Sequence, residues 1–175
     1  MPNVIISTCG TSILTNNVDN SLRNLLNKYT NLQKPTECPE EDRQKIEQHI
    51  NNRQSLVLMC SDHELAKLSA EMNALLRLYN GQNSSQDMHI LIHTDTWLGR
   101  KTGETLRKVL EKRGLTVDTP TIADLRTDSI SGFQFALSDL VKWASETIPG
   151  YTQQKYKVIF NLTGGFKSIQ GFMQA

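Results

Sequence analysis

A turn near the end of the sequence carries residue types that suit an anionic ligand. Residues 156–161 form a β-branched and aromatic run, Gly164 and Gly165 follow it, and Lys167 stands where the chain would enter a helix. Glycines let the backbone approach a ligand closely, a helix start offers unpaired N–H groups, and lysine adds a positive charge. The pattern predicts a phosphate-facing turn at the end of a strand. A tight strand–helix turn that binds nothing is the alternative.

A second turn of this kind lies at the other end of the chain. The β-branched residues 4–6 lead into residues 7–12, which contain Gly10 and several hydroxyl side chains. In a parallel α/β sheet, turns at the carboxyl ends of adjacent central strands face one crevice. Neither turn has the glycine spacing of a dinucleotide fingerprint or a P-loop. The hydroxyls of both turns, and a lysine with no nearby acid, still favour an anionic ligand.

Four segments, taken in order, resemble one family. They are Ser7-Thr8-Cys9-Gly10-Thr11-Ser12, Ser69-Ala70-Glu71, Thr94-Asp95-Thr96 and Asn161-Leu162-Thr163-Gly164-Gly165-Phe166-Lys167. Together they resemble the CRISPR-associated Rossmann fold (CARF) family, in the branch of the standalone ring nucleases and the sensor domains of type III CRISPR effectors.

The resemblance implies a sensor of the type III CRISPR antiviral response. Proteins similar to this chain bind cyclic oligoadenylates across the two-fold axis of a homodimer, and cyclic tetra-adenylate is the ring expected here. The residues expected to contact phosphates are Gly10, Thr11, Ser12, Gly164, Gly165 and Lys167. The residues expected near the adenines or elsewhere along the ligand are Asn16, Thr94, Asp95, Asn161, Thr163 and Phe166.

Ring cleavage is the alternative activity that the resemblance implies. A ribose 2′-hydroxyl would attack the adjacent phosphorus and leave a 2′,3′-cyclic phosphate, a step that needs in-line positioning and charge stabilisation. Ser12 would orient the ribose or phosphate, and Lys167 would stabilise the developing negative charge. No metal or cofactor is expected. A dinucleotide-dependent enzyme is a third reading, and the missing glycine fingerprint argues against it.

Length and composition narrow the classes of partner. The 175 residues suit one domain, residues 1–175, and a formal net charge of +1 gives no signature of a long nucleic-acid partner. No apolar run approaches a membrane span, and the N-terminus lacks a secretion signal. Three cysteines without a C-x-x-C spacing predict reduced thiols in the cytoplasm. An unfinished helix after residue 168 predicts a longer natural chain, with a possible C-terminal effector domain.

The pattern of short apolar strands and helical periods predicts an α/β fold, a Rossmann-like and mostly parallel sheet with helices on both faces. The expected strands are residues 3–8, 88–93, 115–117 and 156–161. The expected helices are one starting at Asp19 or Asn20, an exposed one within 36–52, an unbroken one over 61–79, one over 99–113 with a basic face, and one from about 131 that Pro149 and Gly150 stop.

Several residues keep two readings. Residues 55–60 fit a short strand or a helix, and residues 10–17 fit a ligand loop or a plain loop whose hydroxyls cap a helix. Glu71 is either a buried hydrogen-bonding group or a solvated side chain, and solvation is favoured. His89 and His93 fit ordinary packing better than a metal pair. Asp95 fits a ligand contact or a helix cap, and the basic helix face fits a nucleotide contact or plain solvation.

Overall fold

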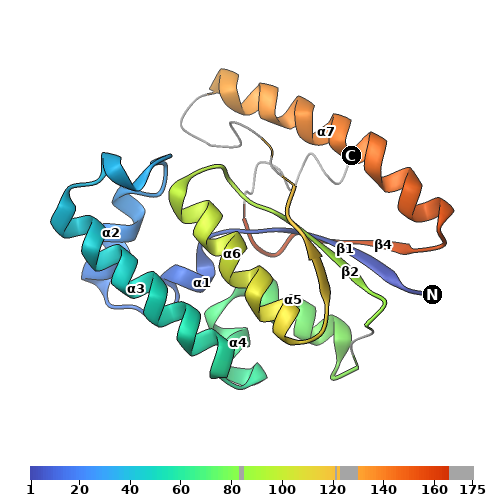
Figure 1. The fold of residues 1–175 in the computed structure, drawn as a ribbon, viewed down its shortest axis with the longest axis horizontal. Helices are drawn as coiled ribbons and strands as arrows, with labels where there is room; N and C mark the ends of the chain where they lie inside the picture. The colour runs from blue at the N-terminus through green and yellow to red at the C-terminus, as the bar shows by residue number, and fades with distance from the viewer. Residues whose placement is uncertain (83–84, 121, 123–129, 166–175) are drawn as a thin grey trace.

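A computed structural model of the chain describes residues 1–82, 85–120, 122 and 130–165, and Figure 1 shows its fold. Within these residues, the strands form one four-stranded, all-parallel sheet in the order β3-β2-β1-β4. The strands are β1 (Asn3–Thr8), β2 (Met88–Ile92), β3 (Thr116–Asp118) and β4 (Lys157–Asn161). The predicted α/β class with a parallel sheet is therefore confirmed.

The strand β1 lies in the interior of the sheet and sets its register. Its residue Ile5 stands opposite His89 of β2 on one side and Ile159 of β4 on the other. Five of the six β1 residues are buried, as expected for a strand covered on both faces. Because all strands are parallel, the turns that follow β1, β2 and β4 share one edge of the sheet, which we call the carboxyl edge.

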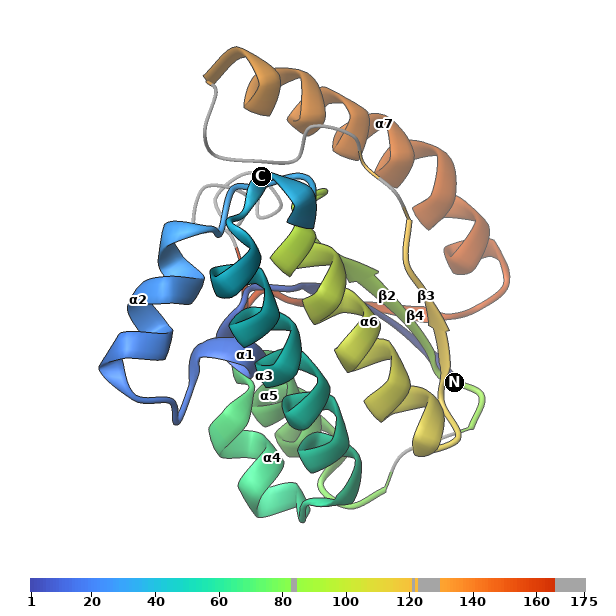
Figure 2. The same cartoon turned by 60° about the vertical axis from the view of Figure 1, so that its left-hand side comes forward.

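Helices cover both faces of the sheet (Figures 1 and 2). Alternate β1 residues point to opposite faces, so Ile5 joins one apolar core and Val4 and Ile6 join another. The Ile5 core packs under six helices, whereas the Val4 and Ile6 core packs under α7 (Ile130–Gln153). The six helices are α1 (Ser12–Thr15), α2 (Asn20–Lys28), α3 (Glu40–Met59), α4 (Asp62–Leu68), α5 (Ala70–Tyr79) and α6 (Trp97–Lys112).

The helix expected over residues 61–79 is broken in two, and the prediction of one unbroken helix is wrong. Ser61 and Glu64 form the capping box that starts α4. At Ser69 the backbone is extended, and the Ser69 hydroxyl accepts from the Met72 N–H at 3.2 Å to start α5. The apolar stripe continues across the break with nearly unchanged spacing, so periodicity could not reveal it. The break places Ser69 and the following turn at the carboxyl edge.

The structure also decides two further helix boundaries. Residues 55–59 form the last turns of α3, which resolves the strand-or-helix ambiguity in favour of a helix. The stop predicted at Pro149 and Gly150 is wrong, because α7 continues through Pro149 to Gln153. Ile148 and Tyr151 both pack against the core under α7, so tertiary contacts hold this end of the helix despite the proline.

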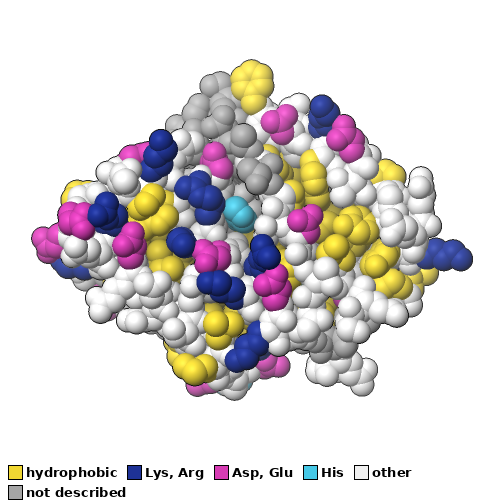
Figure 3. Space-filling model, viewed as in Figure 1, with side chains coloured by type: hydrophobic (Ala, Val, Ile, Leu, Met, Phe, Trp, Pro, Cys, Tyr) yellow, Lys and Arg dark blue, Asp and Glu magenta, His cyan; other side chains and the backbone are white. Residues whose placement is uncertain are grey.

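The exposed face over α3 and α6 carries charges of both signs (Figure 3). On α6, Lys101 and Lys108 both pair with Glu104, at 2.9 and 2.8 Å, and Arg107 pairs with Glu111 at 2.7 Å. Three of the six basic residues of this face therefore pair with carboxylates of the same helix, at solvent-exposed positions, which favours the solvated interpretation for them. No described helix combines the length and apolarity needed to cross a bilayer.

Candidate ligand site at the carboxyl edge

The two glycine turns are in direct contact at the carboxyl edge. A Cβ built on Gly10, after β1, would lie 2.6 Å from the backbone nitrogen of Gly165, after β4. The Thr8 hydroxyl also donates to the Gly164 carbonyl at 2.5 Å. We call these two turns, residues 8–12 and 161–165, together with Glu71, the glycine corner. The strands β1 and β4 are adjacent, as the predicted shared crevice requires.

Glu71 is the centre of this corner. Its carboxylate accepts from the Gly10 N–H at 2.7 Å, from the Ser12 hydroxyl at 2.9 Å and from the Ser69 hydroxyl at 2.7 Å. The side chain is fully buried, at 0% exposure, so the favoured solvated reading of Glu71 is wrong. A buried carboxylate requires several hydrogen bonds, and here donors from the turn after β1, from α1 and from the α4–α5 break supply them.

The paired glycines are needed to accommodate Glu71 and the β1 turn. A Cβ on Gly164 would lie 1.8 Å from Glu71 Oε1, which no side chain tolerates without displacement of the carboxylate. Gly165 has φ of 79°, a conformation that favours glycine, and a Cβ there would lie 3.2 Å from the backbone of Thr8 and Cys9. Internal packing therefore accounts for both glycines, whether or not a ligand approaches them.

Asn161 joins the end of β4 to β1 and α5. Its side-chain amide donates to the Ser7 hydroxyl at 3.3 Å and to the Glu71 carbonyl at 3.2 Å. The Thr163 hydroxyl lies 2.6 Å from Asn161 Oδ1 and 3.2 Å from the Ala70 carbonyl. Asn161 is buried and Thr163 is exposed, so Asn161 holds the corner together and Thr163 faces outward from it.

The loop after β2 lies beside the corner. The Cys9 N–H donates to the Ile92 carbonyl at 2.8 Å, which extends the β1–β2 pairing up to this loop. Thr96, rather than Asp95, caps α6 by accepting from the Gly99 N–H at 3.1 Å, and the Thr94 hydroxyl lies 2.8 Å from that of Thr96. The alternative reading of Asp95 as a helix cap is therefore wrong. Asp95 Oδ2 accepts from Gln33 Nε2 at 3.4 Å.

Ser12 and Asn16 bracket a short helix inside the expected ligand loop. The Ser12 hydroxyl, besides donating to Glu71, accepts from the Ala70 N–H at 3.1 Å. Asn16 lies at the far end of α1, where its carbonyl accepts from Arg53 Nη2 at 2.8 Å. Thr11 precedes α1 and makes no side-chain capping bond. Phe166 and Lys167 lie outside the described residues.

The histidines and the buried thiol have structural surroundings. His89 Nε2 lies 2.7 Å from the Tyr79 hydroxyl, and burial lowers the pKa of His89 to about 4. His93 contacts the Thr94 carbonyl through Nδ1 at 2.8 Å. Burial is the larger cause, and the negative charge of Glu71 the smaller cause, of a raised pKa of the Cys9 thiol, so this thiol stays protonated. Within the described ranges, no three His, Cys, Asp or Glu side chains gather as metal ligands.

Sequence reasoning missed the partners of Glu71. The motif Ser69-Ala70-Glu71 does not by itself predict that the Ser69 hydroxyl caps α5 and binds Glu71. Ser7 and Thr8, at the end of β1, contact Asn161 and Gly164 across 154 and 156 positions of sequence. A serine at Ser69 just after an apolar helical stripe is a recognisable capping signal, whereas contacts at such separations leave no local pattern.

A known protein family matches the part of the chain that contains most of this site. The family described as CRISPR-associated protein (Cas_APE2256) matches residues 66–175, which is more than half of the chain. The chain belongs to this CRISPR-associated family. The matched region contains Ser69, Glu71 and the β4 turn, while the β1 turn precedes it. The CRISPR-associated relationship expected from the motifs is confirmed. No curated protein matches the chain.

Proposed function

We propose that the glycine corner of this CRISPR-associated chain is a CARF-type site for a cyclic oligoadenylate, with cyclic tetra-adenylate as the first candidate. The observation that carries the proposal is the contact between Gly10 and Gly165, which unites two polar turns at the carboxyl edge of adjacent parallel strands. Ligands of open α/β sheets bind at this edge, where the ends of adjacent strands meet. Membership of a CRISPR-associated family supports a ligand from that defence system.

The hydrogen bonds of the corner assign different roles to its polar groups. The Glu71 carboxylate already accepts hydrogen bonds from the Gly10 N–H and the Ser12 hydroxyl, so we assign Glu71 to shaping the turn rather than to binding the ligand. The Thr11 hydroxyl makes no capping hydrogen bond, so it remains a candidate donor to a phosphate, whereas the Thr163 hydroxyl already donates to Asn161 Oδ1 or to the Ala70 carbonyl. The carboxylate of Glu71 repels a phosphate, so the expected positive charge of Lys167 has to outweigh it.

The two-fold symmetry of a homodimer would match the repeating structure of such a ligand. A cyclic tetra-adenylate repeats the same phosphate and adenine groups around a ring, and two copies of one corner related by a two-fold axis repeat in the same way. We therefore propose that two chains share one ring. The response sensed would be that of a type III CRISPR system, with the output of an effector domain, if one follows, controlled by the bound ring.

Calorimetry tests the binding. We expect saturable binding of cyclic tetra-adenylate at one ring per two chains, and much weaker binding of the linear tetra-adenylate. Lys167→Ala should cost about 1.5–3 kcal/mol, as for a charge-assisted hydrogen bond. Lys157→Ala, at the opposite end of β4, is the matched control and should bind as the wild type does. A folded dimer that fails to bind the ring, or binds it equally well without Lys167, contradicts the proposal.

Slow ring cleavage without metal is the second candidate, and the fixed hydroxyl of Ser12 favours it. This hydroxyl donates to Glu71 and accepts from the Ala70 N–H, which leaves one oxygen lone pair in a set direction. That lone pair could orient a ribose 2′-hydroxyl for attack, with Lys167 stabilising the charge on the phosphate. Chromatography of the cyclic tetra-adenylate after incubation with the protein in EDTA distinguishes cleavage from binding alone. An intact ring after hours with excess protein rejects cleavage and leaves binding untouched.

A further inference from the structure

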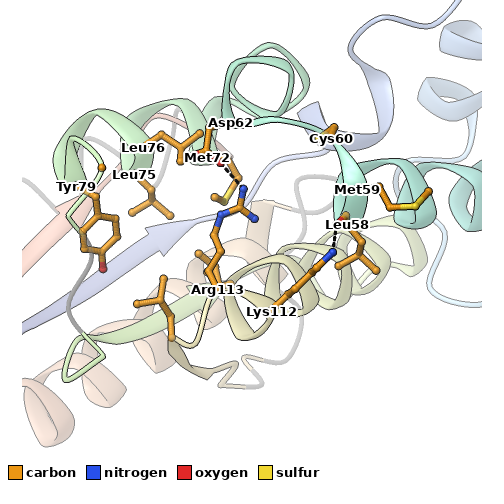
Figure 4. A pocket seen from close by; sticks show the side chains of 13 residues that line it. Leu58, Met59, Cys60, Asp62, Met72, Leu75, Leu76, Tyr79, Lys112 and Arg113 are labelled. Carbon is orange, nitrogen blue, oxygen red and sulfur yellow. Dashed lines mark hydrogen bonds and ion pairs between the residues drawn. The ribbon is translucent and has the colours of Figure 1, made fainter.

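The hollow shown in Figure 4 lies between the ends of α3, α5 and α6 and the start of α4. The two cations that line it already have partners, because Arg113 Nη2 lies 2.6 Å from Asp62 Oδ1 and Lys112 donates to the Leu58 carbonyl. The apolar side chains at its base, such as Met72, are almost fully buried. Contacts within the chain therefore account for the described groups of this hollow.

A groove on the opposite face of the sheet presents exposed apolar surface. Its volume is about 350 Å³, and its walls are one side of α7 and the end of β4. Val141 is 43% exposed and Phe160 is 41% exposed, although both side chains are apolar. Ser145 is the one polar residue among the described residues that line the groove; the others are Leu140, Val141, Ala144, Ile148, Pro149 and Phe160. A contiguous apolar surface of this kind marks a site for a partner that covers it.

The groove lies at an open edge of the sheet. Among the described strands, β4 is the last in the order, and it pairs with β1 alone. Val158 and Phe160 are two positions apart, so both point to the face that α7 covers, where Val158 packs against the apolar core. Among the described helices, α7 lies alone on this face (Figures 1 and 2). The groove is therefore the position beside α7 where a further helix of the same layer would pack.

The fold leaves this face for a helix that follows β4. On the other face the place beside β4 is taken by α5, because Glu71 of α5 lies against Gly164 and Ile159 packs against the core on that side. Connections between parallel strands are right-handed. The helices between β1 and β3 accordingly lie on the α5 face, and α7, which leads back across the sheet to β4, lies on the opposite one. The same rule puts a helix that continues from β4 toward its open edge on the α7 face.

We propose that residues 166–175 of this chain cover the groove as an amphipathic helix. They lie outside the described residues and follow the β4 turn directly. Their apolar side chains are Phe166, Ile169, Phe172 and Met173. On a helix with about 100° per residue, these four fall within one arc of about 120° that holds no other residue of the segment. As a helix the segment is about 15 Å long, which matches the length of about 14 Å from Leu140 to Pro149 along α7.

The covalent connection favours this segment over a second copy of the chain as the occupant. Residues joined to the groove by a short turn meet it at a high effective concentration, whereas a second copy must associate from solution. Docking would also hold Lys167, the second residue after Gly165, at the carboxyl edge. The groove would then position the charge that the proposed ligand site needs. This consequence rests on the proposed function, whereas the docking itself does not.

Disulfide crosslinking of the full chain tests the docking. In a Cys60→Ser background, which leaves two buried native thiols, Ala144→Cys combined with Ile169→Cys should form an intramolecular disulfide on mild oxidation. Such a bond needs two Cα atoms within about 7 Å. Glu146→Cys combined with Ile169→Cys is the matched control and should stay reduced, because Glu146 is an exposed residue of α7 outside the groove. Val141→Cys combined with Ile169→Cys is a second groove pair that allows for a small shift of the helix.

Mass spectrometry of the oxidised chains distinguishes the outcomes. A crosslink within one chain in a groove pair, absent from the control pair, supports the proposal. No crosslink in either groove pair, or equal crosslinking in the control pair, overturns it. A covalent dimer overturns it as well and identifies a second copy as the occupant.

Thermal unfolding provides an independent test. Ile169→Asp places a charge on the apolar side of the segment and should lower the unfolding midpoint by about 4–8 °C. Gln170→Asp, on the polar side, is the control and should lower it by less than about 2 °C. Equal midpoints of the two variants would mean that Ile169 is not buried and would overturn the proposal. Neither experiment contains cyclic oligoadenylate, so a failure here leaves the proposed function untouched.

Discussion

The backbone N–H of Gly10 donates to the carboxylate of Glu71 at 2.7 Å, across 61 positions of sequence. A second residue of the same turn, Ser12, donates to the other oxygen of that carboxylate. The turn after β1, where Gly10 approaches Gly165 of the β4 turn, is therefore held by a side chain of α5. The conformation of the candidate ligand site depends on this one buried acid.

Glu71→Ala should destabilise the chain strongly. The change leaves three buried or half-buried donors without their acceptor, and we expect a loss of about 2–4 kcal/mol in the free energy of unfolding measured with urea. Glu146→Ala, at an exposed site on α7, is the control and should change stability by no more than about 0.5 kcal/mol. Equal stability of the two variants would contradict the role of Glu71.

Gly164→Ala and Gly150→Ala should change stability in opposite directions. The added methyl at Gly164 meets Glu71 Oε1, and we expect a loss of about 1–3 kcal/mol or more from the forced rearrangement. At Gly150 a Cβ has nothing within 4 Å and the residue lies in α7, so alanine should stabilise by about 0.5–1 kcal/mol. Thermal unfolding of both variants checks this. A Gly164→Ala variant as stable as the wild type would mean that Glu71 is not where the structure places it.

Stability should fall as the pH is lowered from about 6.5 to about 4. Burial lowers the pKa of His89 to about 4, whereas an unfolded histidine titrates near 6.5. In this window the unfolded chain binds more protons, so acid favours unfolding, by about 3 kcal/mol at most from His89. Burial also lowers the pKa of His49, which adds an effect of the same sign.

Urea unfolding of His89→Gln across this pH window isolates the His89 contribution. Glutamine does not titrate but can still hydrogen-bond to the Tyr79 hydroxyl, so the variant should lose most of the pH dependence. His63→Gln, at an exposed site on α4, is the control and should keep it. A His89→Gln variant whose stability falls as steeply as that of the wild type would refute the assignment.

The three thiols should react in a fixed order. Cys9 and Cys38 are buried, Cys60 is partly exposed, and burial raises the pKa of each. A thiol reagent needs both access and a thiolate, so we expect Cys60 to be modified first and Cys9 only on unfolding. Mass spectrometry of peptides from the native chain measures the order. Early modification of Cys9 would show that the β1 turn opens readily.

The sequence predicted all four described strands to within one residue at each end, because short β-branched runs between helical periods leave a clear local signal. It also predicted that the β1 and β4 turns would share an edge, since parallel strands allow little else. It failed at Glu71, whose partners Gly10 and Ser12 come from the far N-terminus. Polar contacts between distant segments have no periodicity, so a charged residue beside an apolar stripe reads as solvated even when it is the centre of a site.

The helix boundaries at Ser69 and Pro149 are predicted wrongly for a different reason. The break at Ser69 keeps the apolar stripe in phase, and only the serine hydroxyl at the start of α5 marks it. At Pro149 the local rule predicted a stop, but packing of the flanking Ile148 and Tyr151 on the core outweighs the lost helical hydrogen bond. Local propensities decide such cases only where tertiary contacts are weak.

The ten-residue helix α5 carries Glu71 near its start and Tyr79 at its end. At about 1.5 Å per residue it is about 15 Å long. Glu71 binds the turn after β1, and the Tyr79 hydroxyl contacts His89 near the start of β2, so both ends of one helix are tied to strands of the sheet. A displacement of α5 along its axis would therefore strain both contacts at once.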